Sequence, residues 1–223
     1  MAPYSIRKYQ DQDREVVRNM FSNGILSHVP TSFFHLLKQP RSFLLFLSVP
    51  GALFLGSSSL LLSLLALPGL LVFLWMAVRY PFKCYVDHAL HTDLRDIRKS
   101  YLSERGCCFW VAESEDQVVG MVCVCPVQQA SRRQKCLQLF HLSVSPEYRG
   151  QGIAQTLTQT VLQFAQDQGY DAVVLSVLCL NYSAQRLYEK MGFWKSHESF
   201  DSVIWRVIDL RFSYYEYSVP SSL

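Results

Sequence analysis

Residues 144–154 read VSPEYRGQGIA and connect an apolar, strand-like segment to the start of a predicted helix. The first N–H groups of a helix have no partner within it, and they form the positive end of the helix dipole. Gly150 and Gly152 allow a ligand to approach the backbone closely, and Arg149 adds a fixed positive charge. The turn is therefore suited to hold a diphosphate, although such a turn taken alone also occurs as a plain loop.

The pattern of apolar residues and turn residues on both sides of this turn predicts a mixed α/β domain. The predicted strands are Tyr4–Tyr9, Cys107–Glu113, Val118–Pro126, Gln134–Val144, Ala172–Cys179, Phe193–Ser196 and Ser202–Phe212. The predicted helices run from Asp11 or Asp13 to Gly24, from Thr92 to about Ser103, from Gly152 to Gln168, and from Ser183 to Met191.

A second motif follows the turn after one predicted helix and one predicted strand. Residues 181–193 read NYSAQRLYEKMGF. This segment resembles the N-x-x-A-x-x-L-Y-x-x-x-G-F segment of the GNAT superfamily of acetyltransferases, and R-G-Q-G-I-A at residues 149–154 resembles its R/Q-x-x-G-x-G/A signature. The resemblance implies the α/β (α+β) GNAT acyltransferase fold, a mixed central sheet flanked by helices, and acetyl-CoA as co-substrate without a metal.

The resemblance also implies roles for individual positions. Arg149 and the backbone N–H groups of the following turn would hold the pyrophosphate of coenzyme A, at Gly150, Gly152, Ile153 and Ala154. Leu142 and Val144 would pair with the amides of pantetheine, and Asn181 would reach the cofactor arm.

Direct transfer is the mechanism that the resemblance implies. A neutral amine attacks the thioester carbonyl, and the thiolate that leaves needs a proton donor. The hydroxyl of Tyr188 would act as this general acid. The alternative for Tyr188 is packing at helical spacing with Leu187 and Met191.

The sequence offers more than one candidate for the general base. Many relatives place a Glu on the long strand, but the matching position here is Gln138, which cannot accept a proton. His141 has a suitable ordinary pKa, yet its parity along the strand is opposite to that of Leu142 and Val144. His141 is thus either the base or a structural histidine facing a helix layer, and Glu113 with a water chain stays open.

Further segments resemble the camello-like N-acetyltransferases, including IRKYQ at residues 6–10 and FWVAESE at residues 109–115. This resemblance covers nearly the whole chain and implies a protein of the endoplasmic reticulum or Golgi membrane. Its acceptor would be the α-amine of a cysteine S-conjugate, aspartate in one branch, or lysines of proteins, including histones. A coenzyme A-binding membrane scaffold without catalysis is the alternative from another class, because the strand Glu is missing.

Residues 42–78 contain no charged residue and no His, a run of 37 residues. One membrane crossing needs about 20 apolar residues. We therefore expect a hairpin or re-entrant pair that turns near Gly56–Ser59, while one long tilted span and a buried core helix are the alternatives. Pro50 and Pro68 would kink its two limbs.

The hydrophobic segment divides the expected domain. Residues 1–35 would supply its first strand and helix, 36–83 the membrane-embedded segment, and 84–223 the main acetyltransferase domain. Because a sheet cannot pair across a bilayer, both halves must lie on one side of it. We expect the cytosolic side, where acetyl-CoA is made, with a lumenal domain as the competitor.

Charge and cysteine content bear on whether the protein binds nucleic acid, contains disulfides or binds zinc. A net charge of +3 and a pI of ≈ 8.4 do not indicate a nucleic-acid partner. The basic residues Arg132, Arg133 and Lys135 predict a solvated loop or a contact to an acidic group. Seven cysteines are present, most of them in apolar, strand-like runs, and none forms a C-x-x-C pair, which favours a reducing compartment and argues against a disulfide framework or a zinc site.

Overall fold

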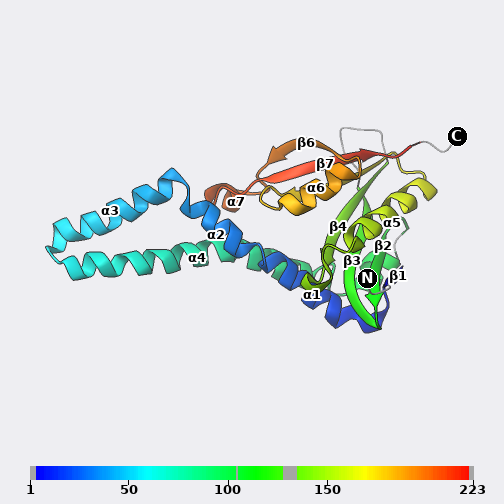
Figure 1. Ribbon diagram of the computed structural model, residues 1–223, viewed down its shortest axis with the longest axis horizontal. Coiled ribbons are helices and arrows are strands. Elements are labelled where there is room, and N and C mark those ends of the chain that lie inside the picture. Colours follow the sequence, from blue (N-terminus) through cyan, green and yellow to red (C-terminus); the bar gives the residue numbers. More distant parts are fainter. Residues whose placement is uncertain (1–3, 104, 128–134, 221–223) are drawn as a thin grey trace.

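The computed structural model describes residues 4–103, 105–127 and 135–220, which form one seven-stranded sheet flanked by helices (Figure 1). The strands are β1 (Tyr4–Lys8), β2 (Cys108–Ser114), β3 (Gln117–Val127), β4 (Cys136–Val144), β5 (Ala172–Leu178), β6 (Trp194–Ser199) and β7 (Phe212–Ser218). The α-helices are α1 (Arg14–Leu26), α2 (Val29–Leu37), α3 (Pro40–Ser57), α4 (Leu60–His91), α5 (Ile153–Asp167), α6 (Tyr182–Lys190) and α7 (Val203–Val207). Short 3-10 turns lie at Asp11–Asp13 and Pro146–Tyr148, and a π-helical turn at Arg98–Leu102.

The strands follow the order β1-β2-β3-β4-β5-β7-β6, with a parallel pair, β4 and β5, in an otherwise antiparallel sheet. The pairing of β4 with β5 ends at Gln138 and Val174, although both strands continue. The two strands therefore separate beyond this point and open the middle of the sheet. Leu142 and Val144 lie beyond the last pair, on the splayed end where the sequence placed them.

Two apolar layers cover the sheet. Helix α5 buries Leu157 and Val161 against one face. Helix α1 buries Val17 and Phe21 against the other face, together with the end of α4. Full burial of each such side chain stabilises the fold by about 1.5–3 kcal/mol. The two layers hold the separated ends of β4 and β5 between them.

Helices α3 and α4 form an antiparallel hairpin that projects away from the sheet (Figure 1). They join at Ser58, which has φ 52°, and Ser59, within the predicted turn. Both helices are long and apolar enough to cross a membrane. In the most apolar 18-residue stretch of each helix, only 6% (α3) and 17% (α4) is buried inside the protein. The segment therefore forms two separate helices in the structure, and it is neither a buried core helix nor one continuous helix. Pro50 and Pro68 lie inside these helices.

Most other predicted elements form close to their expected bounds, but the helix predicted from Thr92 to about Ser103 is reduced to the π-helical turn Arg98–Leu102, and the end of α1 differs. Thr92 follows the end of α4 instead of starting a helix, and its hydroxyl donates to the carbonyl of His88 (2.8 Å). Helix α1 passes through Gly24 and ends at Leu26. Gln134, the expected start of the long strand, lies outside the described residues, as do Arg132 and Arg133.

The predicted strand Ser202–Phe212 is wrong, because its first half forms the short helix α7 and the last strand starts only at Phe212. Trp205 and Ile208 are buried against α4, whereas Val207 is exposed, a spacing that suits a helix. The aromatic residues at and after Phe212 form β7.

The structure also corrects the expectation that the cysteines argue against disulfides. Cys107 and Cys125 are joined by a disulfide, with their Cα atoms 4.2 Å apart. Antiparallel pairing of β2 with β3 places Cys108 opposite Val124, so the two cysteines lie opposite each other at the end of this ladder. The two cysteines meet because of the register between β2 and β3, and no local sequence motif predicts that register.

Candidate active site

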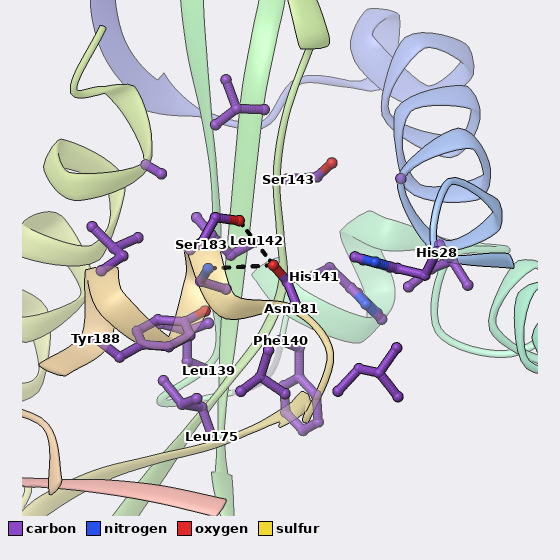
Figure 2. A pocket seen from close by; sticks show the side chains of 18 of the residues that line it. His28, Leu139, Phe140, His141, Leu142, Ser143, Leu175, Asn181, Ser183 and Tyr188 are labelled. Atoms are coloured by element: carbon purple, nitrogen blue, oxygen red, sulfur yellow. Dashed lines mark hydrogen bonds between the residues drawn. The ribbon is translucent and has the colours of Figure 1, made fainter. Parts of the chain in front are cut away.

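An open cavity of ≈ 730 Å³ lies where β4 and β5 separate. From the layer of α5 and α6 it is lined by Ile153 and Tyr188, and from the opposite layer by Phe21 and Phe82. The cavity thus passes through the opened sheet and reaches both layers. Figure 2 shows side chains from both sides converging on it.

Strand β4 is irregular at His141. The register with β3 shifts between Met121 and Cys123, and His141 has φ +54°. The positive φ costs a non-glycine residue of order 1 kcal/mol, which surrounding contacts must offset. His141 faces α1, where its ring lies 4.6 Å from that of Phe21, while Val144 packs on the side of α5. The structure therefore confirms that His141 faces a helix layer, and this wall also lines the cavity.

Asp93 and Tyr101 hold His141 in place. The Nε2 atom of His141 lies 2.7 Å from Oδ2 of Asp93, and the hydroxyl of Tyr101 donates to the same oxygen (2.5 Å). Burial raises the pKa of Asp93, but hydrogen bonds from His141, Tyr101 and Thr92 outweigh it and bring the pKa to about 2. The ionised Asp93 accepts a hydrogen bond from Nε2–H of His141, and this tautomer leaves Nδ1 as the acceptor.

The turn before α5 has the geometry that a bound diphosphate needs. Gly150 has φ +77° and Gly152 has φ +86°, a region that side-chain-bearing residues rarely adopt. A Cβ at Gly150 would meet nothing within 4 Å, so the backbone faces open space. No side chain caps the N-terminus of α5, which leaves the N–H groups near Ile153 and Ala154 available. All four residues line the cavity and fit the pyrophosphate of coenzyme A.

Arg149 fastens this turn to the splayed strand. Its Nε donates to the carbonyl of Val144 at 3.0 Å. Burial lowers the pKa of His28, and the charge of Arg149 lowers it further. His28, the N-cap residue of α2, reaches the same cavity (Figure 2). The guanidinium thus adds positive charge beside the turn, as the sequence predicted.

Asn181 lies at the start of α6 and caps it. Its Oδ1 accepts from the N–H of Ala184 (3.3 Å) and from the hydroxyl of Ser183 (2.9 Å), as the dashed lines in Figure 2 show. Its side-chain amide lines the cavity with its NH₂ group not used by the cap. The predicted contact to the cofactor arm is compatible with this position.

Tyr188 presents its hydroxyl to the cavity from α6. The side chain is 5% exposed, and its ring contacts those of Phe193 (5.5 Å) and Tyr215 (6.1 Å). Burial raises the pKa of Tyr188, so the phenol stays protonated near neutral pH. Within the part of the chain that the structure describes, no hydrogen bond engages this hydroxyl. The ring of Tyr188 can therefore pack in the core while its hydroxyl donates a proton in the cavity.

Glu113 is not a candidate base. Its carboxylate pairs with Arg7, which also pairs with Asp13, and Glu113 does not line the cavity. Gln138 does line it, at the last pair of β4 with β5. Of the two candidates for the general base, His141 and Glu113, only His141 lines the cavity, and it does so on the side of α1.

An apolar wall beside His141 was not foreseen from the sequence. It consists of side chains from α1, α4, α7 and β7, namely Phe21, Ile25, Phe82, Tyr85, Trp205 and Phe212. Asp93 and Tyr101 were also missed as site residues, because they lie far from His141 in the chain. Over residues 4–103, 105–127 and 135–220, no group of three or more potential metal ligands is found.

Comparison with known proteins identifies relatives over the full length of the chain. Residues 74–193 match the family model described as the acetyltransferase (GNAT) family. N-acetyltransferase 8B of Homo sapiens is 51% identical over 222 residues, which cover 100% of this chain and 98% of that protein. N-acetyltransferase 8 of Rattus norvegicus is 50% identical over 222 residues and 100% of both chains.

A solved structure supports the fold independently. The acetyltransferase of the GNAT family from Staphylococcus aureus Mu50 superposes with a TM-score of 0.56 at 17% sequence identity. The superposition covers 98% of this chain and 100% of that one. At this identity the likeness concerns the fold alone.

Proposed function

The chain belongs to the GNAT family of acetyltransferases and is an acetyl-CoA-dependent N-acetyltransferase, and from this premise we propose that its acceptor is the α-amine of a cysteine S-conjugate or a similar amino acid. The observation that carries the proposal is the apolar, largely aromatic wall of the cavity beside His141. A lipophilic substituent on sulfur would bury its surface there, at about 25 cal/mol per Å². Free aspartate has no apolar group for this wall.

In the proposed reaction, acetyl-CoA supplies an acetyl thioester, and the residues of the cavity position both partners and move the protons. The α-amine forms the new N–C bond as the C–S bond breaks. Nδ1 of His141 accepts the proton that the amine loses, and Asp93 stabilises the resulting imidazolium. Tyr188 donates its proton to the departing sulfur.

The binding roles follow the placement of the predicted residues. The N–H groups at Gly150, Gly152, Ile153 and Ala154 hold the diphosphate, and Arg149 adds charge. The edge of β4 at Leu142 and Val144, which β5 leaves unpaired, pairs with the pantetheine amides, and the Val144 carbonyl also accepts from Arg149. Asn181 donates to the cofactor arm.

We also propose that the α3–α4 hairpin lies in the membrane of the endoplasmic reticulum or Golgi. Helix α3 has 18 residues, about 27 Å at 1.5 Å per residue, close to the roughly 30 Å hydrocarbon core of a bilayer. Its large apolar side chains face outward, with Leu47 at 76% and Leu55 at 84% exposure. Burial in lipid would remove this surface from water.

The pairing of β1 with β2 constrains the topology, because the hairpin lies between these strands in the chain. Both ends of the hairpin must therefore return to one side of the bilayer. We propose the cytosolic side, where acetyl-CoA is made. The Cys107–Cys125 disulfide is the one observation that favours the lumenal side, since disulfides persist in an oxidising compartment.

An acceptor panel tests the proposed substrate. Full-length protein in detergent or nanodiscs would receive acetyl-CoA with S-benzylcysteine, aspartate or a histone-tail peptide. We expect the highest kcat/KM for S-benzylcysteine. We also expect Tyr188→Phe to lower kcat by about 10²-fold, the usual size of an acid–base contribution. Faster acetylation of the peptide would indicate a protein lysine acetyltransferase instead, and coenzyme A binding without turnover on any acceptor would indicate a scaffold.

A further inference from the structure

Helix α7 has two faces with different surroundings. Trp205, within it, and Ile208, directly after it, are 9% and 4% exposed and pack against α4. Val203, Ile204 and Val207 are 75%, 46% and 65% exposed, on the outer side. Helix α7 thus has a buried apolar face and a second, outward apolar face, and nothing in the described part of the chain covers the outward one.

The position of α7 indicates what covers that outer face. Trp205 contacts Phe82 with ring centroids 5.0 Å apart, and Ile208 belongs to the same cluster as Leu74 and Val78 of α4. Charge returns to α4 at Arg79, directly after the uncharged run. Helix α7 therefore lies beside the point where the hairpin joins the domain, as Figure 1 also shows.

Charge around α7 suits an anionic surface. Arg206 and Arg211 both stack on the ring of Phe200, at 5.5 and 5.2 Å. The hairpin is flanked by Lys38, Arg41, Arg79 and Lys83. Asp201 and Asp209 are the acidic residues of this segment. Asp201 accepts from the Tyr214 hydroxyl, and Asp209 lies 3.8 Å from His35.

We propose that α7 is an interfacial helix, whose outer face rests in the headgroup region of an anionic bilayer and guides apolar acceptors into the cavity. The inference rests on the proposed insertion of the hairpin. The apolar hairpin surface continues onto α7 at its root, and apolar side chains next to basic ones are typical of interfacial helices. The same segment supplies Asp201 and Trp205 to the wall of the cavity. A lipophilic conjugate dissolved in the bilayer surface would thus enter without passing through bulk water.

Depth-dependent quenching tests this contact without relying on activity. Single cysteines would replace Val203 or Val207, with Leu47→Cys on α3 and the exposed Gln163→Cys on α5 as the matched controls, all in a Cys84→Ser background. Each would carry a fluorophore in full-length protein reconstituted in phosphatidylcholine–phosphatidylserine nanodiscs. Nitroxide would be placed on the lipids near the headgroup or deep in the chain.

We expect the shallow nitroxide to quench positions 203 and 207 at least twofold more than position 163, and the deep one to quench position 47. Quenching at 47 with none at 203 and 207 would overturn the role of α7 alone. No quenching at 47 would overturn membrane insertion as well. Shielding of 203 and 207 from aqueous iodide without lipid quenching would show that a protein partner covers α7, which also contradicts the proposal.

Steady-state kinetics with a long-chain and a short-chain acceptor test whether α7 guides apolar acceptors into the cavity. In the variant Val203→Ser/Ile204→Ser/Val207→Ser, we expect KM for an S-dodecylcysteine acceptor in vesicles to rise about tenfold. For S-methylcysteine we expect kcat and KM to stay unchanged. An equal change for both acceptors would contradict entry along α7.

Discussion

Asp93 holds the imidazole of His141 through one hydrogen bond, and its loss should affect catalysis more than cofactor binding. In Asp93→Asn the side-chain amide can donate to Nε2, which favours the tautomer with the proton on Nδ1. We therefore expect kcat to fall by about 10²-fold, the low end of a general acid–base contribution, with KM for acetyl-CoA unchanged. Steady-state kinetics would check this. The control is Tyr101→Phe, which removes a bond to Asp93 but keeps its charge and should cost less than Asp93→Asn.

The same carboxylate predicts a pH dependence of stability. Its pKa of about 2 lies below the ordinary 3.8, so the ionised form is favoured in the folded state. Its contribution is present above pH 4 and is lost as pH falls through about 2. We expect the difference in free energy of unfolding between the wild type and Asp93→Asn to be constant above about pH 5 and to shrink below about pH 4. A difference that grows towards low pH, in denaturant titrations of detergent-solubilised protein, would contradict this.

At the level of single residues, the sequence predicted the side of the sheet that His141 faces, because side chains alternate along a strand. It did not predict Asp93, which lies 48 residues away in the chain from His141. That contact depends on how the end of α4 packs on β4, a tertiary property without a local pattern. Only the family resemblance marked Tyr188, because its packing with Phe193 looks like that of any buried tyrosine.

At the scale of elements, the turn before α5 is the feature most directly open to test. Gly150→Ala would place a Cβ at φ +77° in open space. Gly169→Ala is the matched control, because Gly169 also has a positive φ, +66°, and open space, but does not line the cavity.

Each substitution should cost about 1 kcal/mol of stability from backbone strain. Only Gly150→Ala should also raise the Kd for coenzyme A, by about tenfold or more, because the backbone that faces the diphosphate shifts. Isothermal titration with coenzyme A would separate the two effects. An equal Kd for the two variants would argue against binding at this turn.

Elements with strong periodicity were predictable, and those fixed by tertiary contacts were not. Helix α5 and the β2–β3 hairpin follow from the spacing of apolar residues along the chain. The sequence predicts a strand where α7 forms. The helix is stabilised by packing of Trp205 against Phe82 of α4, a tertiary contact that the local sequence does not show. Helix α4 continues through Pro81 to His91, whereas the predicted domain boundary lay at residues 83 and 84. The three-part division of the chain stays a prediction.

At the scale of the whole molecule, the pairing of β1 with β2 predicts the topology. Tags at the N- and C-termini should be digested by protease together, or be protected together, in sealed microsomes. Digestion of both would support the cytosolic side, and protection of both would place the domain in the lumen. Digestion of one tag alone would contradict the hairpin, because the sheet cannot pair across a bilayer.

The side of the membrane on which the domain lies also determines whether Cys107 and Cys125 are oxidised or reduced. If the domain is cytosolic, the disulfide of the structure should be reduced in the cell, and both thiols should then react with maleimide after rapid denaturation. On the lumenal side they should react only after reduction. Mass mapping of the alkylated peptides would show this. A stable disulfide in a chain whose tags are both digested would contradict the expected link between side and redox state.

The central claim is direct acetyl transfer from acetyl-CoA to the α-amine of a cysteine conjugate in the cleft between β4 and β5. A single-turnover experiment with acetyl-labelled acetyl-CoA and S-benzylcysteine tests it most directly. We predict that the label passes to N-acetyl-S-benzylcysteine at the rate at which acetyl-CoA disappears, with no labelled protein at any time. Label held covalently on the protein before product forms, or no labelled conjugate while a lysine peptide is acetylated, would contradict the account.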